Sequence, residues 1–269
     1  MGKMKKVMNI IVVVFMIVCC SVKSNDAMAQ KQKTPDQVMT SIYTAYDSIS
    51  NLSFDVAYTY TDDSLNGHSA HESMKGAYTM SGKKVLYNLG NIQFMQNDSF
   101  FIAVYNDEKF ILVTNPRVAN VGSNLPMRSM MDSMLHSYAA DYTISVKRIN
   151  DSTNAISFVR ADSLAKFDKL TVSYSSKKRA FLRSISYNFK QASMDDNPTG
   201  PDNGNEQPVY HTKNLTINFS NYRVDNFSKN LYDEGDYIKF DNGNWVPADK
   251  YENFKIYYTR TGAAGTQSK

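Results

Sequence analysis

The sequence predicts a mainly β protein: a single large, curled antiparallel sheet, a half-open β-barrel, that encloses a few helices. Three observations predict this fold. Strand-forming aromatic residues are abundant, with 18 Tyr and 14 Phe in 269 residues. From Ser53 onward apolar and polar residues alternate, which is the period of a strand with one face in water. Turn dipeptides such as Ser81-Gly82 and Asn97-Asp98 separate these segments, and connections this short join antiparallel neighbours.

Residues 1–29 have the composition of an export signal. Three lysines lie close to Met1, and the apolar run 10–18 that follows is shorter than the roughly 20 residues of a membrane-spanning helix. Ala27-Met28-Ala29 has the form of an ordinary cleavage site, which predicts a periplasmic protein. Alternatively, the stretch 17–21 resembles the lipobox of bacterial lipoproteins, in which case acylation of Cys20 anchors the chain to the outer membrane.

The export segment holds four lysines, one aspartate and both cysteines. Residues 30–269 therefore carry 26 Lys and Arg against 25 Asp and Glu, which gives no reason to expect nucleic acid as a partner. Because they contain no cysteine, they form no disulfide, thiol nucleophile or thiolate metal site. We predict one β domain over residues 30–260, a monomer, with a disordered tail at 261–269.

A helix is predicted at the start of this domain. Thr34 is the N-cap, Pro35 suits the first helical position, and Gln37 completes a Thr-x-x-Gln capping box. Apolar residues then recur at helical spacing on one stripe: Val38, Ile42, Ala45, Tyr46 and Ile49. The helix is therefore expected to pack one face onto another element.

Six strands are predicted next, near 53–61, 73–80, 83–89, 91–96, 99–105 and 108–114. In the third strand Val85, Tyr87 and Leu89 share one face, the pattern of a half-solvated strand. The hairpin 99–113 differs, because its two strands are apolar on both faces. We expect its second face either to be covered or to bind a ligand.

A second helix is predicted over 127–138. Its apolar stripe is unusually rich in methionine and consists of Met127, Met130, Met131, Met134, Leu135 and Tyr138. Methionine side chains are flexible and polarizable, so this stripe either fills the core or lines an adaptable cavity. In the second interpretation acyl chains enter between this helix and the sheet, and the hairpin residues Phe101, Phe110 and Leu112 complete the lining.

Further strands are predicted near 141–149, 154–160, 167–175, 180–190, 209–222, 235–240 and 253–259. Residues 192–208 contain three prolines among Gly, Asn and Asp, which indicates an exposed loop, either an insertion or a mobile flap.

Motifs of catalysis are not found in the sequence. It contains no Gly-x-Ser-x-Gly elbow, no phosphate-binding glycine loop and no His-Glu-x-x-His. His68 and His71 are three residues apart in a turn or strand, where side chains point to opposite faces, so they are not expected to share a metal. We predict no enzyme activity, cofactor or metal. A β-rich hydrolase with scattered carboxylates remains as an alternative.

A tripeptide of Asp, Ser and an apolar residue occurs four times, beginning at Asp47, Asp63, Asp132 and Asp162. It resembles the O-glycosylation sequon that one Gram-negative phylum uses on exported proteins. Ser64 is the best candidate for modification, because it is predicted to lie in an exposed turn.

Three stretches resemble the outer-membrane lipoprotein carrier family (LolA/LolB-like). They are the turn 80–83 with the strand that follows it, the turn 96–99 before an apolar strand, and the strand 215–222. The order of helix, hairpins, central helix and strands resembles the family over most of residues 35–260.

The resemblance implies a half-open barrel, lidded by helices, that holds the acyl chains of lipoproteins and carries them across the periplasm. The expected function is therefore a non-enzymatic lipid or lipoprotein binder, with acyl chains as partner. The same fold also serves periplasmic regulators, so an envelope interaction module with a filled core is the alternative.

Overall fold

The computed structural model describes residues 33–62, 70–116, 128–136, 139–161, 167–177, 179–192 and 210–259. The chain divides into two compact units, Met1–Thr34 and Pro35–Lys269, and the helices and strands described below belong to the second. The predicted export segment with Cys20, the candidate glycosylation site Ser64, the loop after residue 192 and the predicted tail lie outside the described residues.

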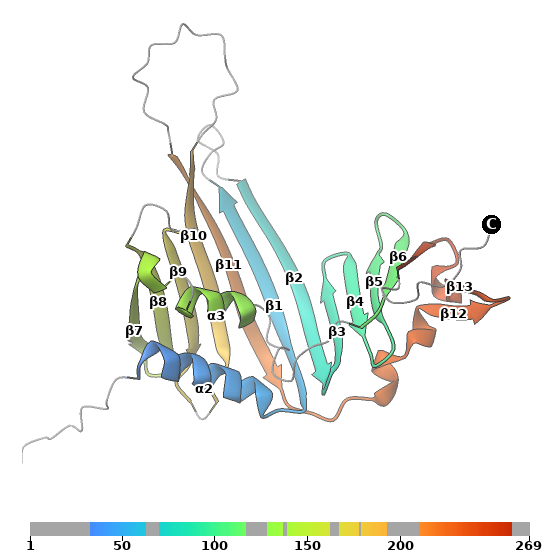
Figure 1. Ribbon diagram of the computed structural model, residues 1–269, viewed down its shortest axis with the longest axis horizontal. Coiled ribbons are helices and arrows are strands. Elements are labelled where there is room, and N and C mark those ends of the chain that lie inside the picture. The colour runs from blue at the N-terminus through green and yellow to red at the C-terminus, as the bar shows by residue number, and fades with distance from the viewer. Residues whose placement is uncertain are drawn as a thin grey trace, which may run out of the picture. The chain divides into compact units, whose positions relative to one another are not determined.

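Twelve strands form one sheet in the order β14-β6-β5-β4-β3-β2-β1-β11-β10-β9-β8-β7 (Figure 1). Their bounds are β1 Asn51–Asp62, β2 Ala70–Ser81, β3 Lys84–Leu89, β4 Ile92–Gln96, β5 Phe101–Tyr105, β6 Phe110–Thr114, β7 Tyr142–Asn150, β8 Thr153–Arg160, β9 Lys169–Ser175, β10 Leu182–Ala192, β11 Tyr210–Arg223 and β14 Lys255–Thr259. The end strands β14 and β7 do not pair with each other, so the sheet is open.

Two α-helices and several short elements complete the described fold. The helices are α2 Pro35–Asp47 and α3 Arg128–His136. The short elements are the 3₁₀ turns η1 Ala139–Asp141, η2 Lys229–Tyr232, η3 Glu234–Asp236 and η4 Asp249–Tyr251, and the hairpin of β12 Ile238–Asp241 and β13 Asn244–Pro247.

The predicted fold class, a mainly β protein with one large sheet, is confirmed. The antiparallel expectation holds for every pair in the large sheet but one, since β14 runs parallel to β6. Strand β13 was not predicted, because it has only four residues and ends in proline. Its turn does have a local signal: Asn242 and Gly243 both have positive φ, at 47° and 84°, as a tight hairpin turn requires.

The register of the strands divides the side chains between two faces of the sheet. One face, called here the helix face, is traced by cross-strand partners from Phe54 in β1 toward the β14 edge: Tyr78, Tyr87, Phe94, Ala103, Leu112 and Tyr257. The other is called the far face. Because successive residues of a strand point to opposite faces, these assignments extend along each strand.

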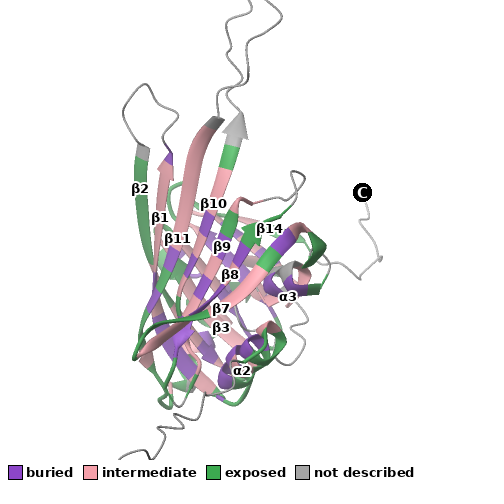
Figure 2. Cartoon of the chain, turned by 90° about the vertical axis from the view of Figure 1, so that its left-hand side faces the viewer, coloured by how far each residue is buried: buried purple, intermediate pink, exposed green. Residues whose placement is uncertain are grey.

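In the helix half of the sheet, β7 to β11 with β1 and β2, the helix face is buried under α2 and α3 (Figures 1 and 2). Ile42 of α2 and Met131 of α3 join Ile156, Val172 and Ile185 of the sheet in one core. The far face of this half is polar and forms side-chain ladders, such as Ser186 with Thr216 and Asn188 with Asn214. This half therefore has one core side and one solvated side.

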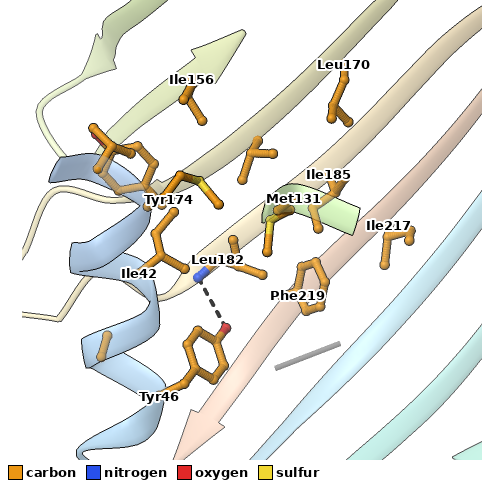
Figure 3. Close-up of a cluster of buried hydrophobic side chains, with 14 of the residues drawn as sticks. Ile42, Tyr46, Met131, Ile156, Leu170, Tyr174, Leu182, Ile185, Ile217 and Phe219 are labelled. Carbon is orange, nitrogen blue, oxygen red and sulfur yellow. Dashed lines mark hydrogen bonds between the residues drawn. The ribbon is translucent and has the colours of Figure 1, made fainter. Parts of the chain in front are cut away.

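Two tyrosines, Tyr46 of α2 and Tyr222 of β11, fasten α2 to the sheet, and Figure 3 shows the bond of Tyr46 to Leu182. The register between β9 and β10 shifts after Leu182, which leaves the Leu182 backbone groups for other partners. The Leu182 N–H donates to the Tyr46 hydroxyl at 3.3 Å, and the Tyr222 hydroxyl donates to the Leu182 carbonyl at 3.0 Å. The two hydroxyl oxygens are 2.6 Å apart. Because the Tyr222 hydrogen is used in the bond to Leu182, Tyr46 is the donor to Tyr222, and the three hydrogen bonds close a ring.

In the C-terminal half of the sheet, β3 to β6 with β14, the far face is the buried one. Its side chains Met95, Ile102, Val104, Ile111 and Val113 pack against the segment 228–254, which supplies Tyr232, Tyr237, Ile238 and Tyr251. Buried Asn97 ties the β4–β5 turn to this segment: its amide donates to the Tyr232 carbonyl at 3.2 Å and to the Glu234 carboxylate at 2.5 Å. The two halves of the sheet are thus covered on opposite faces.

Candidate functional site

An apolar surface remains on the helix face of the C-terminal half. We call it the aromatic face, and its side chains are Val85, Tyr87, Leu89, Ile92, Phe94, Phe101, Tyr105, Phe110, Leu112 and Tyr257. All are partly exposed except Tyr257, which is exposed. Among the described residues, neither hydrophobic core includes Phe94, Phe101, Phe110 or Leu112. This surface lies beside the helix-covered core, and the described helices do not bury it.

The rings of the aromatic face form a continuous row. Starting from buried Phe54, centroids follow at 4.9 Å to Tyr78, 5.6 Å to Tyr87, 5.9 Å to Phe94 and 6.1 Å to Phe101. These separations lie in the range of favourable ring contacts. The row is therefore held in place by its own neighbours before any ligand binds.

A second group of rings lies at the β14 edge of the same face. Tyr105 stacks on Phe110 with centroids 4.3 Å apart, and Tyr257 meets Phe110 edge-on at 5.5 Å. Leu112 lies between the two groups, opposite Ala103 of β5 and Tyr257 of β14 in the register. Ala103 is small and buried, so its larger neighbours in the register, Phe94 and Leu112, form the surface at this point.

The aromatic face carries a charge only at its β14 edge, where exposed Lys255 lies opposite Phe110 in the register. On β3 to β6, whose residues are all described, this face contains apolar side chains, Gln96 and Thr114 but no charged residue. The Tyr87 hydroxyl lies 3.0 Å from the Tyr58 hydroxyl at the border with the helix half. Burial raises the pKa of Tyr87, and the neighbouring Tyr58 raises it further, so Tyr87 stays neutral at physiological pH. The surface suits an uncharged, apolar ligand.

The predicted cavity residues of the second helix fall into three groups. Met131 and Leu135 are buried in the core of the helix half (Figure 3 shows Met131). Met130 and Met134 lie in α3, and their side chains are outside the described part of the structure, as are Met127 and Tyr138 altogether. Met131 is therefore a core residue, which agrees with the interpretation that the methionine stripe fills the core.

The predicted hairpin residues Phe101, Phe110 and Leu112 all lie on the aromatic face. They belong to neither core, whereas Met131 belongs to the helix-covered one. That the two groups line one shared cavity stays a prediction. Sequence reasoning missed Phe94, Tyr105 and Tyr257, although the alternation that grouped Val85, Tyr87 and Leu89 continues through the next strands.

Polar contacts join α3 to α2 in antiparallel order. Asp36 lies 3.5 Å from His136, the Tyr43 hydroxyl donates to Asp132, and Arg128 lies 3.2 Å from Asp47. The Arg128 guanidinium also lies 4.3 Å from the centre of the Tyr43 ring. Exposed ion pairs contribute little to stability, so apolar burial of Met131 is the stronger attachment of α3.

Groups for catalysis or metal binding are not gathered in the described ranges. No set of three or more His, Cys, Asp or Glu residues there is placed to hold a metal ion. Asp62, at the end of β1, accepts from the Tyr60 hydroxyl at 3.0 Å and pairs with Lys213 at 3.0 Å, which is a structural ion pair. None of the helices in those ranges has the length and apolar character needed to cross a membrane.

Comparisons with known proteins give distant structural similarities and no match in sequence. No sequence-family profile and no curated protein matches it. Among solved structures, a conserved protein of uncharacterised function from Thermus thermophilus matches with a TM-score of 0.40 and 5% identity, over 84% of this chain and all of that one.

Two other solved structures have names that agree with the resemblance found in the sequence. A LolA superfamily protein from Nitrosomonas europaea matches with a TM-score of 0.24, and a domain described as an outer membrane lipoprotein-sorting protein from Vibrio parahaemolyticus with 0.31. Each is 8% identical and covers 75% of this chain and 98% of its own. Likenesses this distant carry no argument about the family or the ligand of this chain.

Proposed function

We propose that the protein is a non-enzymatic, periplasmic binder of the acyl chains of lipids or lipoproteins, and that the chains lie on the aromatic face. The observation that supports this most is a contiguous, partly exposed apolar surface that carries no charge on β3 to β6. Contiguous exposed apolar surface on a folded protein marks a site of contact with an apolar partner. The export segment and the resemblance of the sequence to lipoprotein carriers support the location.

The chemistry of the surface fits a flexible hydrocarbon better than a reactive substrate. Each methylene group removed from water contributes about 0.8 kcal/mol, so about 16 methylenes, when fully buried, contribute about 13 kcal/mol. About 5 kcal/mol for the cost of association then leaves micromolar binding. The paired hydroxyls of Tyr58 and Tyr87 lie at one border of the row and would accept or donate a hydrogen bond to the polar end of the lipid. In this arrangement the protein holds its ligand without covalent chemistry.

The two predicted endings of the export segment give the proposal two forms. Cleavage after Ala29 makes a soluble shuttle between membranes, and acylation of Cys20 makes a receptor tethered to one membrane. Both forms present the same aromatic face.

The test is fatty-acid binding by a variant with polar groups on the aromatic face. Phe101→Gln combined with Leu112→Gln removes two partly exposed apolar side chains from this surface. At about 1 kcal/mol for each, we expect the dissociation constant of a fluorescent fatty acid to rise about 30-fold. Native mass spectrometry of the unmodified protein should show an acylated lipid that copurifies.

Phe240→Gln is the matched control, because Phe240 is 64% exposed and lies on β12, which belongs to the separate two-stranded sheet. It should leave the affinity unchanged. If the double variant binds the fatty acid as well as the unmodified protein does, and no lipid copurifies, the proposal fails. The alternative, an envelope interaction module with a filled core, would then be favoured.

A further inference from the structure

The two edge strands of the large sheet differ in how they are protected. Among the described residues, β7 pairs only with β8 and β14 pairs only with β6. Strand β7 carries exposed Lys147 and Arg148 in succession, which places one cation on each face of the edge. Charges on an edge strand prevent pairing with another chain. Strand β14 has a single charge, Lys255, at its first position.

Strand β14 also exposes large aromatic side chains. Tyr257 is 53% exposed and Tyr258 is 38% exposed, and as neighbours in a strand they lie on opposite faces. Single exposed apolar residues are ordinary, but two in a five-residue edge strand give that edge apolar surface on both faces. Partner chains bind edges of this kind.

The backbone of β14 has groups directed away from the sheet. The Lys255 N–H donates to the Lys109 carbonyl at 3.0 Å, so Lys255 directs its backbone toward β6. Direction alternates along a strand, and therefore Ile256 and Tyr258 direct their N–H and C=O groups outward. The nearby hairpin of β12 and β13 forms its own sheet and does not pair with β14.

We infer that β14 pairs with β14 of a second copy of this chain, antiparallel and across a two-fold axis at Tyr257. In this register Ile256 faces Tyr258 of the other copy, and the outward backbone groups of these two residues bond to one another. Lys255 faces Thr259, so no like charges are opposed. A two-fold contact must be self-complementary, and the sequence of β14 meets this condition when it is paired with itself about Tyr257.

The pairing would extend the aromatic face. Tyr257 already contacts Phe110 edge-on, so the two copies of Tyr257 would join the ring groups of both chains across the axis. This consequence rests on the proposed function, whereas the pairing itself does not. Because a five-residue strand buries less area than a stable dimer needs, the dimer should be weak and reversible, unlike the monomer that the sequence predicts.

Sedimentation velocity of the protein expressed from the full coding sequence tests the pairing, over about 1 to 500 μM. We expect the mass to shift from monomer to dimer across this range. Tyr257→Lys places two ammonium groups opposite each other and should weaken the dimer at least about tenfold. Mixing Tyr257→Lys with Tyr257→Glu should restore a dimer that neither variant forms alone. Phe240→Lys, at a side chain that is also exposed but lies off the edge, should have no effect.

A cross-link locates the contact independently of stability. In this register the Tyr257 Cα atoms lie about 4.5 Å apart, which suits a disulfide, so Tyr257→Cys should form a linked dimer on oxidation, with the link identified by mass spectrometry. Phe240→Cys should not. The inference is overturned if the unmodified protein stays monomeric over the whole range, if Tyr257→Lys dimerises normally, or if Phe240→Cys links as readily. Because Tyr257 belongs to the aromatic face, the proposed function is tested separately, by fatty-acid binding of the unmodified protein at a concentration where it is monomeric.

Discussion

The helix half of the sheet buries its apolar side chains under α2 and α3, whereas the C-terminal half buries them on the opposite face, against residues 228–254. In the helix half the second face is a polar ladder of Ser, Thr and Asn. In the C-terminal half the second face is apolar as well, and it is the aromatic face. Packing in the described structure therefore accounts for one apolar face of the hairpin 99–113 and leaves the other unexplained.

The two regions are connected through a row of rings. Phe54 lies in the helix-covered core and stacks on Tyr78, from which the ring row runs outward through Tyr87 to Phe94. The uncovered surface is therefore a direct extension of the buried one on the same face. A ligand on it would lie against the border of the core, where side chains are already fixed.

The greatest loss of stability is expected from a matched pair of core truncations. Ile156 lies in the core of the helix half and Ile111 in that of the C-terminal half, and both are fully buried. Replacing either by alanine leaves a cavity and should lower the free energy of unfolding by about 2 to 5 kcal/mol. Urea unfolding followed by circular dichroism measures both.

Together, Ile156→Ala and Ile111→Ala test whether the helix half and the C-terminal half of the sheet unfold as one cooperative unit. Strands β2 and β3 hydrogen-bond across the border, so we expect each variant to shift one common transition. If Ile111→Ala instead produces a second, earlier transition while Ile156→Ala does not, the C-terminal half unfolds by itself and the two regions are separate units.

An intermediate effect is expected from alkaline pH, through Tyr46 in the helix half. Burial raises the pKa of Tyr46 well above its ordinary value, although its hydrogen bonds to Tyr222 and Leu182 oppose the rise. The folded state thus keeps the proton while the unfolded chain loses it above about pH 10, so this stability is present below that pH and falls as the pH rises. At about pH 11 the loss is about 1.4 kcal/mol for each such tyrosine.

Tyr46→Phe isolates this contribution. At every pH the variant lacks the hydrogen bonds of the Tyr46 hydroxyl to Leu182 and Tyr222, which costs about 1 to 3 kcal/mol of stability. Its free energy of unfolding should nevertheless fall less steeply between about pH 9 and pH 11 than that of the unmodified protein. Ile42→Val, on the same buried stripe of α2, is the control without a titrating group and should keep the steep fall. Equal slopes for Tyr46→Phe and the unmodified protein would contradict the prediction.

The sequence predicts what local signals determine. The capping box and stripe place α2, and short turns place the hairpins of β3 to β6, because each depends on residues close together in the chain. The pairing of β1 with β11 and of β6 with β14 joins segments more than 100 residues apart and leaves no local pattern.

The same limit applies to the candidate site. The hairpin 99–113 was predicted to be apolar on both faces, which is correct, but which face is covered depends on the segment 228–254. That segment consists of 3₁₀ turns and a short hairpin without a repeating apolar period, so its position is fixed by packing and by the hydrogen bonds of Asn97, and not by periodicity.

The smallest change in stability is expected when the polar contacts between α2 and α3, the two helices that cover the helix half, are removed. Arg128→Met removes the ion pair with Asp47 but keeps a long side chain over the Tyr43 ring. Since such partly exposed pairs contribute at most about 1 kcal/mol, the free energy of unfolding should change by less than that, and raising the salt concentration should have a similarly small effect on the unmodified protein.

Met131→Ala, by contrast, should cost about 2 kcal/mol or more, because Met131 is buried. If Arg128→Met proves the more damaging of the two, then charge and not apolar burial attaches α3, and the helix half is covered less firmly than the C-terminal half.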